Sequence, residues 1–391
     1  MSHTDLERRL TRFLTAESSR AVDTDIAWRE LRSRRQARQG KHRLLTAVSA
    51  AVAVAVAVTI PALVAHRADV GKVARLHAAR PPQVGTVATY PQAVVARIPA
   101  SAWQLAGVQG AVWVLGSAPG QLVRIDTGTN KITRQLALPA GATSAASIAT
   151  GGGALWLNTG AGQVQRLDPA TGAVVVTVHL PETGNCSGAE FGAGGLWVQC
   201  VSGNRTKFVR IDPATNGVNA SIGPMPGKVF VATAAANSLW YLDGSGGVRG
   251  LIRQAARWRA VSVHVPITYP VAFEHPVLVS GAGAVWALTN DESIARINPE
   301  NGQVTRVFTY RDYDPTYQDL LVSLAAGASS LWLLGRGDVL RVDAATGHPL
   351  GSVPVSGSCG QPCVQIYFAQ GSVWFPATSE LSRIDPAKMG G

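Results

Sequence analysis

Acidic and aromatic side chains gather in one short stretch, residues 310–319, which reads YRDYDPTYQD. Carboxylates and tyrosines on a loop can bind a cation, a sugar or a basic peptide, and a solvated insertion is the alternative. Asp312 and Asp314 are separated by one residue, as are the carboxylates in loops that bind hard cations such as Ca²⁺. The glycine and the distal glutamate of an EF-hand loop are missing, so we expect no metal site here. The candidate ligand-binding residues are Tyr310, Arg311, Asp312, Tyr313, Asp314, Tyr317 and Asp319.

A carboxylate stands beside an imidazole at Glu274 and His275, and this pair is the candidate for acid–base catalysis. The other histidines beyond residue 80 stand alone in the sequence. The chain has no GxSxG motif, no phosphate-binding loop and no zinc-ligand cluster. The sequence therefore favours a binding protein without a cofactor over an enzyme, and an enzyme that uses Glu274 and His275 is the alternative.

The chain has four cysteines, and all of them lie beyond residue 180: Cys186, Cys200, Cys359 and Cys363. Their spacing lacks the CxxC pairs and paired histidines of metal sites. An even number of cysteines confined to one part of a chain is typical of disulfides in an oxidising compartment. We expect one disulfide between Cys359 and Cys363 and one between Cys186 and Cys200, with free buried thiols as the alternative.

An uncharged segment of 22 residues, 44–65, precedes this part of the chain. As a helix it is about 33 Å long, which is enough to cross a bilayer core. A cleavable signal peptide has a short leading region, whereas 43 residues precede this segment. The sequence therefore predicts a cytoplasmic basic tail at 1–43, a single transmembrane helix at 44–65, a linker at 66–88 and a large domain at 89–391.

Lysine and arginine are concentrated beside this segment. Residues 28–43 hold seven of them and residues 66–80 hold four, which predicts a cytoplasmic N-terminus and an extracytoplasmic C-terminal domain. The net charge of the chain is +11, but residues 81–391 contribute only +3, so no nucleic-acid partner is expected. Leucines at 6, 10 and 14 share a helical face, and we expect residues 1–43 to form a short helical tail that contacts a cytoplasmic protein or anionic lipid.

Tryptophan recurs through the large domain at intervals of 41 to 46 residues. A turn of small residues precedes each one, and in six of the seven units an Arg-hydrophobic-Asp/Asn strand end and a polar turn follow it. A period of 40 to 50 residues with four short strands per unit is typical of a β-propeller. The sequence predicts an all-β, seven-bladed propeller of four-stranded blades, whose repeated positions are structural. The tryptophans, each expected to pack between adjacent blades, are Trp113, Trp156, Trp197, Trp240, Trp286, Trp332 and Trp374.

Two places break the repeat. The last unit ends without a fourth strand, and the segment AVVARIPA from Ala93 resembles the fourth strands of other units, so we expect it to complete the last blade and close the ring. The fourth unit has Arg253, Arg257, Trp258 and Arg259 in place of the Asp turn. Drift in a tolerant hairpin and a cationic, aromatic contact patch are both compatible with this change.

The units GAGAVWALTNDESIARINPENGQVTRVF and GGGALWLNTGAGQVQRLDPATGAVVVTVHLP resemble the repeats of YncE/YVTN-type propellers and of the virginiamycin B lyase-like superfamily, over roughly residues 90–388. This resemblance implies a propeller with ligand sites at the mouth of its channel. It also implies, as the alternative to binding, a cell-envelope lyase-like enzyme with its site at that mouth. We expect a membrane-anchored extracytoplasmic propeller that binds a ligand or protein, or acts as a sensor.

Overall fold

The computed structural model describes only part of the chain, all of it within the unit Arg75–Gly391. Within those described ranges no helix is long and apolar enough to span a membrane. The predicted tail, transmembrane helix and most of the linker lie outside the described residues, so these assignments stay predictions. The structure describes residues 87–389 except 117–119, 140, 143–145, 183–184, 226–228, 244–246, 255–256, 266–277, 290–292, 310–322, 336, 356–364 and 378.

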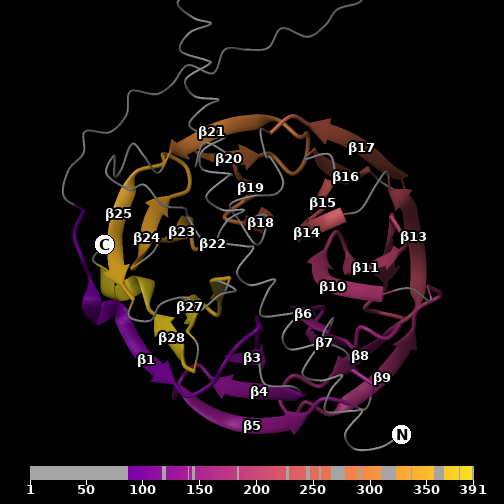
Figure 1. Cartoon of the computed structure of the whole chain (residues 1–391), viewed down its shortest axis with the longest axis horizontal. Coiled ribbons are helices and arrows are strands. Elements are labelled where there is room, and N and C mark those ends of the chain that lie inside the picture. The colour runs from indigo at the N-terminus through magenta and orange to yellow at the C-terminus, as the bar shows by residue number, and fades with distance from the viewer. Residues whose placement is uncertain are drawn as a thin grey trace, which may run out of the picture. The chain divides into compact units, whose positions relative to one another are not determined.

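The described strands form seven antiparallel sheets of four strands each, arranged around a central axis (Figure 1). The all-β, seven-bladed propeller predicted from the tryptophan repeat is therefore confirmed. Of two short 3-10 helices, η1 (Pro91–Ala93) directly precedes the outer strand of the last blade and η2 (Pro386–Met389) follows the third strand of that blade.

Each blade has an innermost strand at the channel, two middle strands and an outer strand. The innermost strands of blades one to seven are β2 (Gln104–Val108), β6 (Ser147–Gly151), β10 (Asn185–Gly192), β14 (Val229–Ala235), β18 (Leu278–Gly281), β22 (Ser323–Gly327) and β26 (Tyr367–Ala369). The second strands are β3 (Ala111–Leu115), β7 (Ala154–Asn158), β11 (Gly195–Ser202), β15 (Ser238–Asp243), β19 (Ala284–Leu288), β23 (Ser330–Leu334) and β27 (Ser372–Pro376).

The third and outer strands complete each blade. The third strands are β4 (Gln121–Asp126), β8 (Gln163–Leu167), β12 (Arg205–Ile211), β16 (Val248–Gln254), β20 (Ser293–Ile297), β24 (Asp338–Asp343) and β28 (Leu381–Ile384). The outer strands are β5 (Lys131–Ala137), β9 (Val174–His179), β13 (Val218–Met225), β17 (Arg257–Val263), β21 (Val304–Thr309), β25 (Pro349–Pro354) and, in blade seven, β1 (Val94–Ile98).

The repeated tryptophans hold neighbouring blades together. Each lies on the second strand of its blade and is at most 1% exposed. Seven apolar clusters fill the interfaces between blades, and each contains one repeated tryptophan; Trp156 of blade two, for example, packs with Leu196, Val198 and Ile211 of blade three. Burying a tryptophan removes about 200 Å² from water and contributes roughly 5 kcal/mol. The predicted packing of tryptophan between blades is confirmed.

Four of the repeated arginines also link adjacent blades: Arg124, Arg166, Arg341 and Arg383. In six blades the arginine of the third strand is paired in register with the tryptophan of the second; the Arg166 guanidinium lies 5.5 Å from the Trp156 ring. Arg166 Nη1 then donates to Pro213 O at 3.0 Å and to Asn216 Oδ1 at 2.7 Å, both in the turn of the next blade. Each such contact satisfies turn carbonyls and joins two sheets that share no β-ladder.

The acids of the repeat stabilise their own turns. Asp168 Oδ1 accepts hydrogen bonds from the backbone N and the hydroxyl of Thr171, both at 2.7 Å. These bonds favour the charged carboxylate and hold the pKa of Asp168 below its usual range, and Asp126 and Asp343 have the same arrangement with the same effect. These repeated acids are therefore turn caps, as expected for structural positions.

The N-terminal strand closes the ring. β1 pairs with β28 in antiparallel register from Val94↔Ile384 to Ile98↔Leu381. Arg383 of the same blade donates to Thr127 O and to Asn130 Oδ1, which belong to the turn of blade one. The predicted closure by the segment from Ala93 is confirmed, and both ends of the propeller domain contribute to one sheet.

Blade four replaces the arginine–tryptophan pair with a different packing. Gly250 stands opposite Trp240, and a Cβ atom there would lie 2.7 Å from the ring. Trp258 packs edge-on against Trp197 of blade three, with ring centroids 5.1 Å apart. The aromatic member of the suspected patch thus stabilises the interface between blades three and four, while Arg257 and Arg259 are exposed.

One predicted disulfide is present. Cys186 on β10 is bonded to Cys200 on β11, and the two residues face each other in the strand register. Both are buried in the interface between blades two and three. Cys359 and Cys363 lie outside the described residues, so their disulfide stays a prediction.

Candidate functional site

The connections between blades all lead to the same end of the channel. Each runs from the end of an outer strand to the start of the next innermost strand, because the seven blades share one strand order. The candidate ligand-binding residues, Tyr310 to Asp319, belong to the connection that leaves β21 at Thr309 and enters β22 at Ser323. Glu274 and His275 belong to the connection that enters β18 at Leu278. Both groups lie outside the described residues, so neither site prediction is tested.

The channel itself is a cavity of about 530 Å³ lined by the innermost strands of all seven blades. Among its lining residues are the seven that stand directly opposite the repeated tryptophans, two residues before the end of each innermost strand. We call these seven the channel ring. Its members are Ala106, Ala149, Glu190, Thr233, Val279, Ala325 and Tyr367.

Glu190 is the only charged side chain among the described residues that line the channel. A bulge at Gly188, with φ +72°, shifts the register of β10 between Ser187 and Ala189, just before Glu190. Burial among the blades disfavours the charged carboxylate and raises the pKa of Glu190 to about 8. Part of the side chain still faces the open channel.

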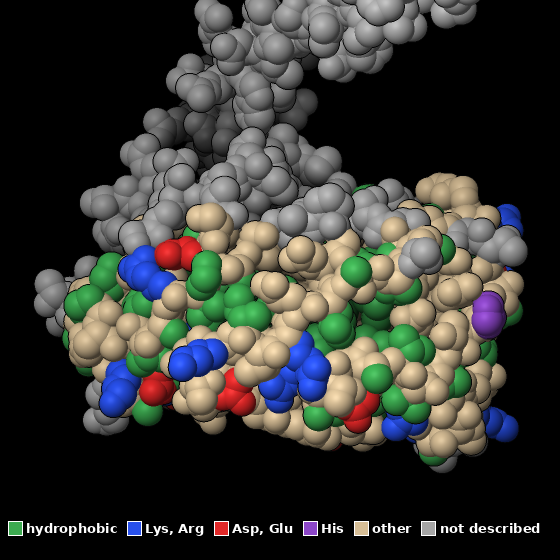
Figure 2. Space-filling model, turned by 90° about the horizontal axis from the view of Figure 1, so that it is seen from below, with side chains coloured by type: hydrophobic (Ala, Val, Ile, Leu, Met, Phe, Trp, Pro, Cys, Tyr) green, Lys and Arg blue, Asp and Glu red, His purple; other side chains and the backbone are tan. Residues whose placement is uncertain are grey.

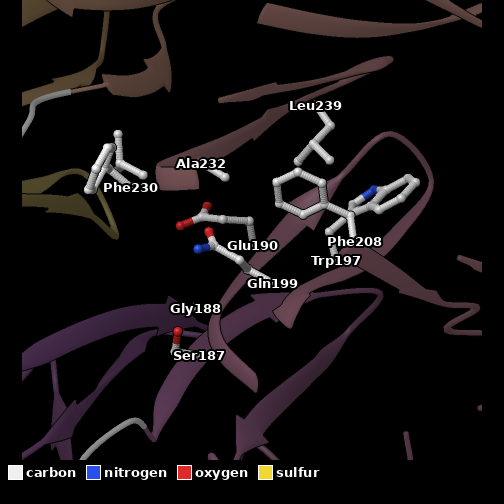
Figure 3. Close-up of a pocket in the computed structure, with 10 residues that line it drawn as sticks. Ser187, Gly188, Glu190, Trp197, Gln199, Phe208, Phe230, Ala232 and Leu239 are labelled. Carbon is white, nitrogen blue, oxygen red and sulfur yellow. The ribbon is translucent and has the colours of Figure 1, made fainter. Parts of the chain in front are cut away.

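A side pocket of about 220 Å³ adjoins the channel between blades three and four. Glu190, Val231 and Ala232 line both cavities, which places the carboxylate between them. Aromatic and aliphatic side chains line the rest of the pocket together with polar groups, of which the Gln199 amide is the largest after Glu190 (Figure 3). Gln199 Nε2 donates to Val229 O at 2.9 Å, which fixes the orientation of the amide.

Tyr367 is the aromatic member of the channel ring. Its hydroxyl donates to Trp103 O at 3.1 Å. Burial, and then the nearby charge of Glu190, raise the pKa of Tyr367, so it stays neutral over the physiological range. Trp103 directly precedes β2 at the mouth and its side chain is 51% exposed, which is unusual for a tryptophan in this chain.

Sequence reasoning did not single out Glu190, Tyr367 or Trp103. The signal for the first two was present: the residue seven positions before each repeated tryptophan is Ala, Ala, Glu, Thr, Val, Ala or Tyr in blades one to seven. Trp103 stands outside the tryptophan period, ten residues before Trp113. In a repeat protein, a position where one blade departs from the others is more informative about function than the repeated residues themselves.

The channel can hold an organic ligand, since its volume falls in the range of small-molecule sites. Within the described part of the chain, no three His, Cys, Asp or Glu side chains come together to hold a metal ion. Exposed lysines and arginines are scattered over the outer face that Figure 2 shows, among apolar and uncharged side chains.

Comparison with solved structures finds propellers. The structure of U3-55K matches with a TM-score of 0.55 and 13% identity over 73% of this chain and 95% of that one. The RRP9 WD40 repeats match with a TM-score of 0.55 and 12% identity over 74% and 99%, and hydrazine synthase from Kuenenia stuttgartiensis with 0.55 and 12% over 74% and 96%. These likenesses show the fold alone. No protein-family model and no curated protein matches the chain.

Proposed function

We propose that the protein is a membrane-anchored extracytoplasmic propeller that binds a protein or ligand at the mouth of its channel and acts as a binding or sensor module. The observation that carries this proposal is the convergence of the connections between blades on one mouth. We expect the connection between β21 and β22 to bring its three carboxylates and three tyrosines close to that mouth. Trp103, which directly precedes β2, is exposed. Loops on a rigid scaffold with exposed aromatic and charged side chains are typical of binding sites.

The membrane anchor is the uncharged segment 44–65, with the N-terminal tail in the cytoplasm. The disulfide between Cys186 and Cys200 supports an oxidising compartment for the propeller. The tail of residues 1–43 contacts a cytoplasmic protein, and its basic residues also favour anionic lipid. Kinship with the YncE/YVTN-type and virginiamycin B lyase-like propellers is part of this proposal and rests on the quoted repeat units.

Topology is tested with a phosphatase reporter that is active only outside the cytoplasm. We expect a fusion after Gly391 to be active and a fusion before residue 44 to be inactive. The reverse pattern would overturn the orientation, and activity of neither fusion in a membrane fraction that contains the protein would overturn the single-span anchor.

The binding face is tested by crosslinking in cells, followed by purification of the full chain and quantitative mass spectrometry. We expect at least one protein to be lost from the Asp312→Ala/Tyr313→Ala variant and retained by Glu300→Ala, whose acid lies on an exposed turn of blade five. Equal recovery of every protein from both variants would overturn the role of the 310–319 loop. Magnesium-dependent turnover lost in Glu274→Gln would instead support the lyase-like enzyme.

A further inference from the structure

We propose that the channel contains a binding site for a small organic cation, an amine that carries an apolar group, with Glu190 as its counter-ion. The apolar group would occupy the side pocket between blades three and four. This site lies inside the channel, and the proposal depends on neither the membrane anchor nor the 310–319 loop.

The Glu190 carboxylate is not paired with any other described polar side chain. No described residue forms a hydrogen bond or an ion pair with the Glu190 carboxylate, although it lies within the ring of blades. An enclosed carboxylate without a partner is costly to the fold. Five of the other six residues of the channel ring are Ala, Thr or Val, which shows that the fold does not require an acid at this position.

Open space lies beside the Glu190 carboxylate. Alanines at 106, 149 and 325 leave the channel open at the level of Glu190, within a cavity of about 530 Å³. Small residues thus surround the acid with room for a ligand headgroup. The 220 Å³ side pocket begins at the same carboxylate, so one molecule can contact Glu190 and fill the pocket at the same time.

The side pocket combines aromatic and aliphatic side chains with one acid. In Figure 3, Glu190 and Gln199 lie between Phe230 on one side and Phe208, Trp197 and Leu239 on the other, and Ser187 adds a hydroxyl to the lining. An aromatic and aliphatic wall next to one acid suits a molecule with a cationic end and an apolar end. An anion has no basic side chain to bind among the described lining residues, and Glu190 supplies a metal ion with only one protein ligand.

The site couples binding to protonation. Among the described residues that line the two cavities, Tyr367 is the other titratable group, and its raised pKa keeps it neutral. Since burial raises the pKa of Glu190 to about 8, about a tenth of the protein carries the charged carboxylate at pH 7 and about nine-tenths at pH 9. A cation that binds the charged form therefore releases a proton and binds about tenfold tighter at pH 9 than at pH 7.

The test uses the full chain purified in detergent solution, with the same detergent solution as the blank, and three probes of one shape: phenethylamine, 2-phenylethanol and 3-phenylpropionate. Isothermal titration calorimetry in buffers of different ionisation enthalpy measures the affinity and the protons released. We expect phenethylamine to bind at least tenfold tighter than the other two probes at pH 9. We also expect it to bind about tenfold tighter at pH 9 than at pH 7, and to release about 0.9 proton at pH 7.

Glu190→Gln keeps the size of the side chain and removes its charge, and we expect it to weaken phenethylamine binding at least tenfold and to abolish the proton release. Glu300→Gln is the matched control and should behave as the unmodified protein. The proposal is overturned if the alcohol binds as tightly as the amine, if Glu190→Gln binds the amine with unchanged affinity, or if the amine does not bind at either pH. The probe comparison and the proton count use the unmodified chain, so the test does not depend on the folding of the variant.

Discussion

The carboxylate in the channel makes a prediction about stability that is separate from any ligand. Burial raises the pKa of Glu190 to about 8 in the folded protein, against a usual value of 4.5. Between these two values the folded chain binds a proton that the unfolded chain has released, so the free energy of unfolding falls as the pH rises. The stabilisation is fully present below pH 4.5 and is lost as the pH passes through about 8.

The size of the effect follows from the shift. Each pKa unit corresponds to about 1.4 kcal/mol, so the loss between pH 4.5 and pH 9 is at most about 5 kcal/mol. Part of the side chain faces the channel, where water can solvate the charge, and this reduces the loss. Even half of the maximum would lower the melting temperature by several degrees in a domain of this size.

Glu190→Gln cannot ionise, so its stability relative to the unmodified protein should increase from pH 5 to about pH 8 and then level off. The buried tryptophans give an intrinsic fluorescence signal for thermal unfolding, which can be followed at each pH for both proteins. Glu300→Gln, changed at an exposed turn, should track the unmodified protein at every pH. Parallel curves for Glu190→Gln and the unmodified protein would refute a raised pKa at Glu190 and the reasoning built on it.

Three further predictions concern the propeller itself. Removing residues 87–98 takes away the outer strand of blade seven and should lower the melting temperature by many degrees in a calorimetric scan, whereas unchanged melting would contradict closure by β1. Replacing Cys186 and Cys200 by serine should cost about 3 kcal/mol in denaturant unfolding, and a non-reducing peptide map should show the link directly; a map with both thiols free would refute it. Gly250→Arg restores the arginine found in the other six blades. It should nevertheless destabilise the fold by about 1–3 kcal/mol in denaturant unfolding, because the new Cβ meets the Trp240 ring. Equal or higher stability would contradict this steric conflict with the ring.

The sequence was sufficient to predict the architecture because the same interface between blades occurs seven times, each time with a buried tryptophan. Each interface between blades needs a large apolar side chain at one position of the second strand, and tryptophan at a period of 41 to 46 residues meets that need visibly. Asp, Pro and Gly residues in the turns mark the ends of the strands. The last unit has no fourth strand after Asp385, which indicated that the segment beginning at Ala93 pairs with this unit. The pairing of Cys186 with Cys200 followed from the same count of strands.

The role of the repeated arginine was not predictable from the sequence, because in four blades its partner lies in the next blade. The bond from Arg166 to Pro213 spans 47 residues, and the bond from Arg383 to Asn130 spans 253. Trp258 likewise contacts Trp197 only because blades three and four are neighbours in the ring. The residue types were visible in the sequence in each case, but the contacts form only when the blades are arranged in a closed ring.

For the candidate channel site too, some features follow from the sequence and others only from the tertiary structure. Sequence alone determined the seven-bladed ring, its closure and the single glutamate seven positions before Trp197. Only the tertiary structure decided that this position faces a channel shared by all seven blades, that a side pocket opens beside it and that no described residue neutralises its charge. The physical reason is that each innermost strand contributes a few residues to the channel, so its volume and its dielectric environment exist only once the ring is closed.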